Sequence, residues 1–461
     1  MVHALKNIWS IPDLRRRVMF TLAMLAVYRV GGHIPTPGVN SAALVRLFEQ
    51  QAGSILGFVD MFSGGYFSQL TIFALGIMPY ITASIILQLL TVIWPYLEKL
   101  SKEGEAGRKK ITQYTRYGTV GLSIVQSFGI ALWLESNNLA GQEPIVVSPG
   151  WGFRLMTVLT LTTGTAFIMW LGEQISERGI GNGISLIIYA GIVVGLPNAI
   201  VSTLQDMSSG SLNPITVLIL IVMMTLVVGA IVFVERAQRK IPIQYARRVV
   251  GRKVYGGTST YLPLRVNTAG VIPVIFASSM LAIPATIGAA FPDVGWIREI
   301  MRQLDYAAPL YLLLYFALII FFCFFYVSII FNPMDQADNM KKYGGFIPGI
   351  RPGKKTAEYI DTLLTRLTFG GSIYLGLVSL LPLVLISGVR IQMLPWIGPT
   401  LDGFLPAMVT QGLNVKFFFG GTALLIVVGV AMDTVQQIES QLIMRHYEGF
   451  LKGTRMRGRR G

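Results

Sequence analysis

The chain of 461 residues is 53% hydrophobic and only 13% charged, whereas soluble domains carry about 25% charged residues. This composition excludes an ordinary soluble protein and indicates a polytopic membrane protein, for which length does not set the number of domains. Cys323 is the single cysteine, which excludes internal disulfides and cysteine metal clusters. The histidines are far apart in the sequence and form no metal-ligand pattern: His3, His33 and His446.

The N-terminal segment ends in three consecutive arginines, Arg15 to Arg17, and the apolar run Val18–Val30 follows. No small-residue cleavage site comes after this run, so the sequence predicts a retained first span and not a signal peptide. Arg29 lies at the far end of the run, and we expect its long side chain to extend to the membrane interface.

The second apolar stretch, residues 60–97, is long enough to contain a membrane-spanning helix. The Gly64–Gly65 pair predicts a short broken helix at Asp60–Ser68 before the span, held there by packing alone. Pro79 lies inside the apolar run and removes a backbone donor, so a neighbouring helix or a water-lined space must compensate. Together with the polar residues at membrane depth, these features indicate the wall of a cavity: Thr82, Ser84, Gln88 and Thr91.

Eight further apolar runs bring the number of predicted spans to ten, and the sequence predicts an all-α polytopic membrane protein. The eight lie at roughly 111–134, 155–172, 182–204, 213–234, 267–291, 306–331, 367–388 and 417–437. If the N-terminus is cytoplasmic, the cytoplasmic segments contain 31 of the 38 Lys and Arg residues. This bias predicts that both termini are in the cytoplasm.

The short loop at 205–212 divides the predicted spans into five and five. Because five is odd, the second half enters the membrane from the side opposite to the first. Two inverted halves around a central site form a known transport architecture. We therefore expect an N-terminal half at 1–204, a C-terminal half at 205–438 and a basic cytosolic tail at 439–461.

Two cytoplasmic loops are too long to be simple connections. Residues 236–265 alternate apolar and polar side chains around Val249–Gly251, which predicts a β-hairpin that extends from the membrane. Residues 332–366 have the pattern of a helix, a turn and a second helix. The turn has the sequence GGFIPGIRPGKK and is too rich in Gly and Pro to be helical.

The spans are almost free of ionisable residues, which argues against ion-coupled transporters and intramembrane proteases. Residues 348–356 have a phosphate-loop-like pattern but lack its first glycine, because Pro348 stands there. We therefore expect a conduit with no catalytic residue, no metal and no cofactor, and not an enzyme. A secondary transporter for a small solute is the alternative, favoured by the inverted halves and disfavoured by the missing charges. A polytopic membrane enzyme is a third interpretation, disfavoured by the lack of an acid, base or metal set.

What could line a path through the membrane is apolar. Isoleucines recur one helical turn apart in two spans and at mid-span in two others: Ile81, Ile85, Ile188, Ile192, Ile275 and Ile426. Periodicity alone favours ordinary core or lipid contact for these residues. Three polar residues at depth fit interhelical hydrogen bonds: Thr91, Gln126 and Asn267.

Long segments of the chain closely resemble the bacterial SecY family, whose members form the central subunit of the protein-translocating channel. The resemblance extends from about Pro12 to Gly461. It includes, in order, DMFSGG, IFALGIMPYITASIILQLL, WLGEQISERGIGNGIS, YLPLRVNTAGVIPVIFASS, FNPMDQADN, GGFIPGIRPGKKT and GGTALLIVVGVAMD. Such a series of long ordered matches is highly specific. The outer loops at 33–55 and 136–150 and the region 289–306 are individual to this chain.

The resemblance implies a clamshell of two five-helix halves around an hourglass pore. The six isoleucines match the aliphatic ring at its waist, which blocks ions by dewetting and yields to a passing chain. Thr91, Gln126 and Asn267 match the polar cluster of the lateral gate. The segment 60–68 matches the plug that closes the outer funnel, and its residues are Asp60, Met61, Phe62, Ser63, Gly64, Gly65, Tyr66 and Phe67.

The resemblance also implies the partners and the function. The two cytoplasmic loops match the docking surface for the motor ATPase SecA and for the ribosome, with Arg252, Lys253 and Arg351 as basic contacts. SecE and SecG are the expected small membrane subunits. Signal peptides, nascent polypeptides and anionic lipids are the other expected partners. The expected function is a passive conduit in the bacterial inner membrane. It passes unfolded polypeptides across and releases transmembrane segments sideways.

Overall fold

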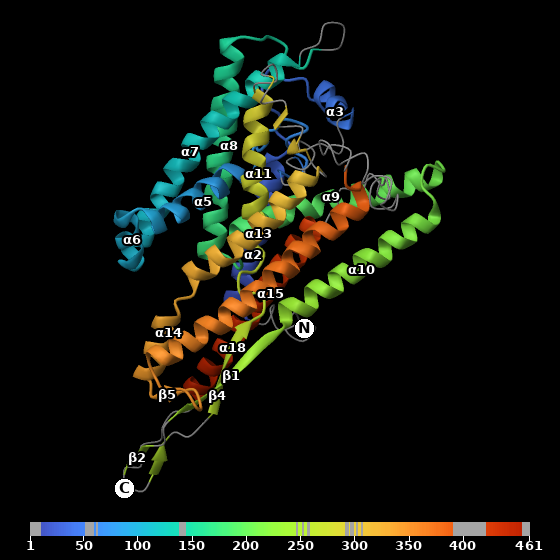
Figure 1. Ribbon diagram of the computed structural model, residues 1–461. Coiled ribbons are helices and arrows are strands. Elements are labelled where there is room, and N and C mark those ends of the chain that lie inside the picture. The colour runs from blue at the N-terminus through green and yellow to red at the C-terminus, as the bar shows by residue number, and fades with distance from the viewer. Residues whose placement is uncertain are drawn as a thin grey trace. The chain divides into compact units, whose positions relative to one another are not determined.

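The computed structural model describes residues 11–50, 60, 63–137, 144–245, 248–250, 253–255, 259–290, 295, 299–300, 303–305, 308–390 and 421–453. Most of them form helices (Figure 1). The chain makes two compact units. The first comprises Met1–Ser202, Ala282–Met301 and Val430–Gly461, and the second comprises Thr203–Leu281 and Arg302–Gly429.

The first unit is built on a group of neighbouring helices. α2 packs against α8, α7 packs against α8, and α5 packs against both α7 and α8. The bounds are α2 Pro12–Gly31, α3 Ser41–Gln50, α5 Met78–Ile93, α6 Pro95–Lys102, α7 Glu105–Ser136, α8 Trp151–Arg178 and α9 Gly183–Ser208. One buried apolar cluster joins α3, the C-terminal end of α7, the N-terminal end of α8 and the segment after residue 63; it includes Phe48, Phe67, Trp133, Leu134 and Phe153.

The second predicted span differs from the expectation in two ways. Residues 72–77 form turns, so α5 begins only at Met78 and Pro79 lies in its first turn. A proline is well tolerated there because the first backbone N–H groups of a helix have no intrahelical acceptor. The expectation that Pro79 needs a compensating partner inside the helix is therefore wrong. At the other end, Trp94 separates α5 from α6 and the two helices are bent by 99°.

The helices of the second unit begin with clear local signals. α10 (Pro214–Arg236) starts with a proline after Asn213, whose side chain accepts a hydrogen bond from the Ile215 N–H. Asn332 and Pro333 repeat this arrangement at α14 (Pro333–Lys342). α13 and α14 both pack against α15. The other helices are α11 Ile272–Ala290, α13 Pro309–Ile330, α15 Lys354–Ser387 and α18 Gly421–Gly453, which ends in the first unit.

The predicted hairpin in residues 236–265 is present. β1 (Gln238–Tyr245) pairs antiparallel with β4 (Ser259–Arg265), and β2 (Arg248–Val250) with β3 (Lys253–Tyr255). A short strand from the loop 332–366, β5 (Gly345–Phe346), adds to the free edge of β1. Apolar side chains of this sheet pack on the inner part of α15 in one cluster: Ile241, Leu264, Ile347, Ile360 and Leu364.

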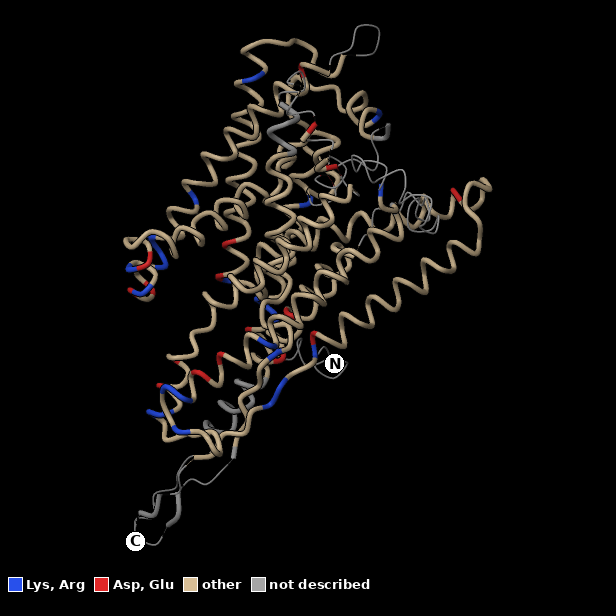
Figure 2. Tube along the Cα trace, in the orientation of Figure 1, with Lys and Arg blue, Asp and Glu red and all other residues tan. Residues whose placement is uncertain are grey.

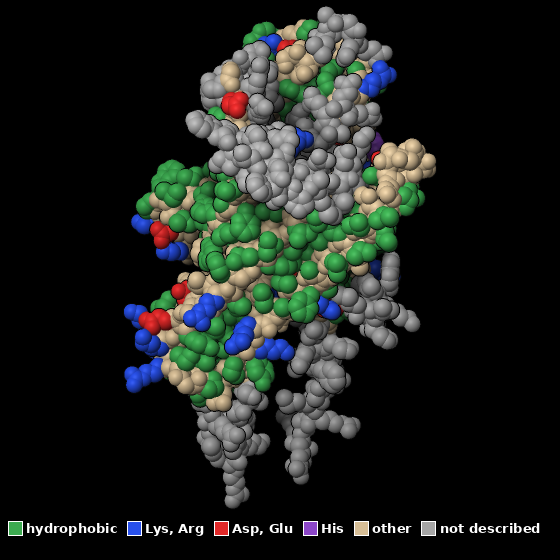
Figure 3. Space-filling model, turned by 45° about the vertical axis from the view of Figure 1, so that its right-hand side comes forward, with side chains coloured by type: hydrophobic (Ala, Val, Ile, Leu, Met, Phe, Trp, Pro, Cys, Tyr) green, Lys and Arg blue, Asp and Glu red, His purple; other side chains and the backbone are tan. Residues whose placement is uncertain are grey.

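Within the described residues, seven helices are long and apolar enough to cross a membrane, or eight if the bent pair α5–α6 counts as one span. The described apolar part of α11 is shorter, Ile272–Pro284, and α2 carries three positively charged residues near its start, Arg15, Arg16 and Arg17. Figure 2 shows that the helices are mostly free of charge along their middle parts. In Figure 3 hydrophobic side chains cover a broad area with Lys and Arg at its lower margin. The chain is therefore a multi-pass membrane protein.

Candidate functional site

The segment 60–68 has the expected break at its glycine pair. Asp60 and Ser63 have helical backbone, whereas Gly64 and Gly65 have φ angles of +80° and +81°. Only glycine adopts such angles at no steric cost, so the helix cannot continue past Ser63. Met61 and Phe62 lie outside the described residues.

Asp60 stabilises the fold of this segment by accepting hydrogen bonds from other residues of the segment. The carboxylate Oδ1 accepts a hydrogen bond from the Ser68 N–H at 2.8 Å. The carbonyl of Asp60 accepts from the Gly65 N–H at 2.9 Å and from Ser63 Oγ at 2.8 Å. Ser63 Oγ in turn accepts from the Phe67 N–H at 3.1 Å. The segment is therefore a compact folded turn with its own polar network.

Two side chains of α2 bind the segment. Tyr28 donates from its hydroxyl to the Ser63 carbonyl at 3.3 Å, and Arg29 donates from Nη1 to the Tyr66 hydroxyl at 2.8 Å. The Arg29 guanidinium, which we expected at the membrane interface, also lies 5.4 Å from the centre of the Tyr66 ring. The prediction that packing alone holds this segment is therefore wrong, because polar contacts hold it as well.

At Gly64 the segment approaches the backbone of α9 closely. A Cβ built on Gly64 would lie 2.9 Å from the Cα of Gly191, a distance that real Cβ atoms essentially never show. Gly191 stands between Ile188 and Ile192, two of the isoleucines proposed from the sequence. The structure thus brings the predicted plug segment against the helix that carries one of the predicted isoleucine rows.

All six proposed isoleucines are buried, with exposed fractions of 5% or less. Ile81 and Ile85 lie on α5, and Ile188 and Ile192 lie on α9, all in the first unit. Ile275 on α11 and Ile426 on α18 belong to the second unit. The next residue along α5 differs sharply, since Ile86 is 43% exposed.

Of the three polar residues predicted for a gate, Thr91 and Asn267 make hydrogen bonds within their own units. On α5, the Thr91 hydroxyl donates to the Gln88 carbonyl at 2.6 Å, within one helix. Gln126 lies half-buried on α7. In the second unit the Asn267 amide nitrogen donates to Glu235 Oε1 at 2.6 Å and to the Gly270 carbonyl at 3.2 Å.

Glu235 is the polar residue that the sequence analysis missed. It lies in the last turn of α10, only 6% exposed, and its partner Asn267 is 3% exposed. A charge at the end of an apolar run ordinarily marks the membrane interface, and Arg236 beside it strengthens that interpretation. No signal in the sequence shows that this carboxylate turns inward to a residue 32 positions away.

The proposed docking residues lie on or beside the sheet. Arg252 lies outside the described residues, and Lys253 begins β3. Arg351 is exposed in the turn between β5 and α15, where its carbonyl accepts a hydrogen bond from Thr356 Oγ1 at 2.9 Å. Gly349 and Gly353 flank it with φ angles of +82° and +100°. The non-helical turn predicted from its Gly and Pro content is present.

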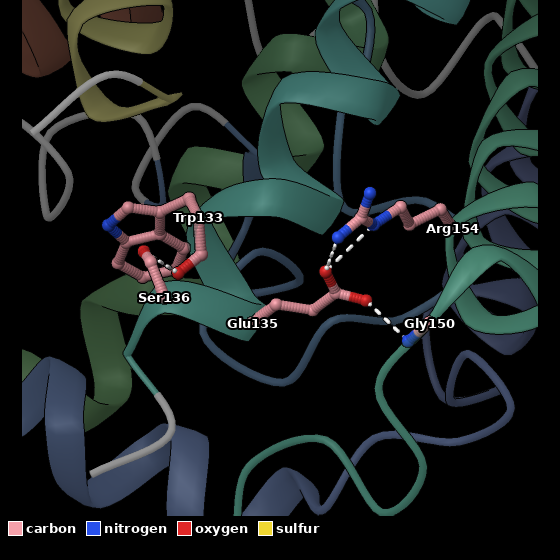
Figure 4. A network of polar contacts seen from close by, with 5 residues as sticks. All are labelled: Trp133, Glu135, Ser136, Gly150 and Arg154. Atoms are coloured by element: carbon pink, nitrogen blue, oxygen red, sulfur yellow. Dashed lines mark hydrogen bonds and ion pairs between the residues drawn. The ribbon is translucent and has the colours of Figure 1, made fainter.

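A second polar network lies at the loop between α7 and α8 (Figure 4). Glu135 Oε2 accepts from Arg154 Nη2 at 2.6 Å and from Nε at 2.8 Å, while Oε1 accepts from the Gly150 N–H at 2.8 Å. Val146 of the same loop bridges Val39, and the Asn40 N–H donates to the Ile145 carbonyl. This loop is therefore folded onto the segment before α3.

Comparison with known proteins identifies the family of this chain. The family model for SecY matches residues 71–435. The "Protein translocase subunit SecY" of Escherichia coli strain K12 is 49% identical over 452 residues, which cover 97% of this chain and 96% of that protein. The chain belongs to the SecY family. The resemblance seen in the sequence motifs is confirmed.

Solved structures agree on the fold. A protein-conducting channel matches with a TM-score of 0.63 and 20% identity, covering 93% of both chains. Sec61 in the canine ribosome–channel complex from the endoplasmic reticulum matches with a TM-score of 0.58 and 18% identity, again covering 93% of both chains. The SecY-family fold thus extends over nearly all of the chain. In the part of the chain that the structure describes, no cluster of His, Cys, Asp or Glu could hold a metal ion.

Proposed function

We propose that the chain is the pore-forming subunit of a protein translocase, with both termini in the cytoplasm of a bacterial cell. The observation that carries this proposal is the contact of Gly64 with Gly191. It sets the glycine-broken segment against α9 at the level of Ile188 and Ile192. A plug resting on a row of buried isoleucines is the arrangement expected of a closed channel.

The six isoleucines form the seal in this proposal. Ile81, Ile85, Ile188 and Ile192 would come from the first half, and Ile275 and Ile426 from the second. An apolar constriction excludes ions because water leaves it, while an unfolded chain passes by displacing the side chains. Asp60–Ser68 would leave its seat when a polypeptide enters. Its hydrogen bonds to Tyr28 and Arg29 set the cost of leaving.

Sideways release would use a lateral gate flanked by Thr91, Gln126 and Asn267. A signal helix gains roughly 0.8 kcal/mol for each methylene transferred from water to lipid. A few interhelical hydrogen bonds of about 0.6–2 kcal/mol each oppose that gain. The gate would therefore act as a threshold that only sufficiently hydrophobic segments cross.

Energy would come from partners that dock on the cytoplasmic loops, namely the motor SecA or a translating ribosome, with SecE and SecG as small membrane subunits. The sheet β4–β1–β5 joins the two loops, and Arg351 stands exposed beside it, which supports a shared docking surface. The family relative Sec61 has been seen in a ribosome–channel complex. Lys and Arg near the inner helix ends would contact anionic lipids.

The test is transport by the purified complex in vesicles. With motor and ATP, a secretory precursor should become protected from added protease, and protection should require an intact signal sequence. Failure of protection, together with uptake of a small solute driven by an ion gradient, would favour a secondary transporter.

A further inference from the structure

Glu235 is a buried carboxylate with a short hydrogen bond. Its Oε1 accepts from Asn267 Nδ2 at 2.6 Å, and both side chains are almost fully buried. Glutamate is rarely buried to this extent unless a partner compensates for the lost water. The contact therefore joins two chain segments, the end of α10 and the residues before α11, through a hydrogen bond between two buried side chains.

The two residues stand at the base of the cytoplasmic sheet. α10 ends at Arg236 and β1 starts at Gln238, while β4 ends at Arg265, just before Asn267. The Val266 N–H donates to the Ala237 carbonyl at 3.1 Å, which extends the β1–β4 ladder to the membrane end. The Glu235–Asn267 contact is thus the next link after the last rung of the sheet.

Asn267 also lies close to the start of α11 in the chain. Asn267 comes five residues before Ile272, where α11 begins, and its amide also bonds the Gly270 carbonyl at 3.2 Å. Ile275 lies in the first turn of this helix. At the far end of the sheet, β5 pairs with β1 and precedes the turn that carries Arg351. The turn that carries Arg351 is therefore connected to α11 by an unbroken series of backbone segments and hydrogen bonds.

We propose that Glu235 is a positioning residue that transmits the docking of a cytoplasmic partner to α11 through Asn267. This inference rests on the proposed function, because it takes the sheet as the docking surface. A bond to a charged acceptor in a dry site is roughly twice as strong as a neutral one. With the bond in place, the sheet and the start of α11 move together. Without it, α11 loses its link to the hairpin.

The experiment measures backbone hydrogen–deuterium exchange of the reconstituted complex, with and without ribosomes bound. In the parent protein, ribosome binding should change the exchange of the first turns of α11. Glu235→Ala should bind ribosomes equally well but lose this response, and its α11 amides should exchange about 10-fold or more faster at rest. Asp335→Ala, which removes an exposed carboxylate from α14, is the matched control and should behave as the parent.

A swap variant separates positioning from general loss of structure. Asn267→Asp alone sets two carboxylates against each other and should uncouple α11. Glu235→Gln combined with Asn267→Asp restores a charged bond with donor and acceptor exchanged, and should recover the response. An unrescued swap, an equal response in Glu235→Ala, or no response of α11 in the parent would each overturn the inference. Precursor transport by the parent protein, measured in parallel, reports on the proposed function separately.

Discussion

Arg29 of α2 holds Tyr66 in two ways at once. Nη1 donates a 2.8 Å hydrogen bond to the Tyr66 hydroxyl, and the guanidinium lies 5.4 Å from the centre of the same ring. The Tyr66 ring also meets Tyr28 edge to face, with centroids 5.5 Å apart. Polar and apolar contacts to a single helix therefore fix Tyr66 of the proposed plug. A substitution can remove its hydrogen bond to Arg29 and leave its ring contacts in place.

The first prediction concerns the Tyr66 hydroxyl. Tyr66→Phe keeps the ring but removes the acceptor of a charged hydrogen bond, a contact of about 1.5–3 kcal/mol. We expect the closed plug to lose about this much stability, so the ion conductance of the resting channel should rise at least about 10-fold. Planar-bilayer recording measures this. Tyr343→Phe is the control, because that ring is 79% exposed on a cytoplasmic loop. Equal conductance in both variants would contradict the prediction.

The second prediction compares neighbouring isoleucines of α5. Ile85 is 3% exposed and Ile86 is 43% exposed. If Ile85 belongs to the seal, Ile85→Ser should let water and ions into the constriction, because a hydroxyl hydrates where an alkyl group does not. Ile86→Ser should leave the resting conductance unchanged. The same leak from both variants would argue for a general packing defect and against a seal at Ile85.

The third prediction is that Arg351 couples the motor. Arg351→Glu should insert with normal topology, since many other Lys and Arg residues remain on the inner side, yet stop motor-driven transport of a precursor into vesicles. Arg351→Lys should be impaired less, because an ammonium cannot copy the planar fork of a guanidinium. Lys342→Glu is the control with an equal change of charge at an exposed site on α14. An inverted topology of Arg351→Glu, mapped by protease, would show that Arg351 serves orientation only.

The fourth prediction tests the hydrogen bond that holds the backbone of Arg351, without altering any charge. Thr356→Val removes the hydrogen bond from Oγ1 to the Arg351 carbonyl but keeps the shape of the side chain. The loss of one such bond costs about 0.5–1.5 kcal/mol. We expect motor affinity to fall by roughly 2- to 10-fold, with the thermal stability of the spans unchanged. Binding of the motor to vesicles measures the affinity, and Thr362→Val is the control at an exposed position of α15.

The fifth prediction concerns the outer loop of Figure 4. Arg154→Met leaves the Glu135 carboxylate, whose side chain is only 10% exposed, without its paired charge. The free energy of unfolding should fall by about 1–3 kcal/mol. Lys102→Met, which breaks an exposed pair with Glu98, should cost less than about 1 kcal/mol. Denaturant unfolding in detergent compares the two, and equal losses would show that the loop does not depend on this ion pair.

Some of the fold follows from local patterns in the sequence. Alternating residues around Val249–Gly251 predict the hairpin, because side chains of a strand alternate between its faces. The glycine pair at 64–65 predicts a broken helix, and both residues do have positive φ angles. Membership of the SecY family follows from long ordered motifs. These features depend on neighbouring residues, which is why a single sequence is enough to predict them.

Other features depend on contacts between distant residues and were missed or predicted wrongly. Pro79 was assigned to a helix interior, yet α5 begins one residue before it. The 99° bend between α5 and α6 was not predicted, and α6 packs against α7 beyond it. The hydrogen bond of Glu235 to Asn267 joins residues 32 positions apart, and the bonds of Tyr28 and Arg29 to the segment 60–68 need α2 beside it. Tertiary contacts decide all of these, and periodicity carries no information on them.

The close approach of the Gly64 and Gly191 backbones limits which substitutions the protein tolerates there. Neither glycine has a side chain, so a substitution at this contact cannot be compensated by repacking larger or smaller neighbouring side chains. A library that randomises residues 60–68 should yield functional clones with varied side chains at many positions. It should keep glycine at 64, because any Cβ there would push the segment off α9. At Gly64 the proposed plug would thus tolerate no side chain, whereas its contacts with α2 involve side chains that can be exchanged at a measurable cost.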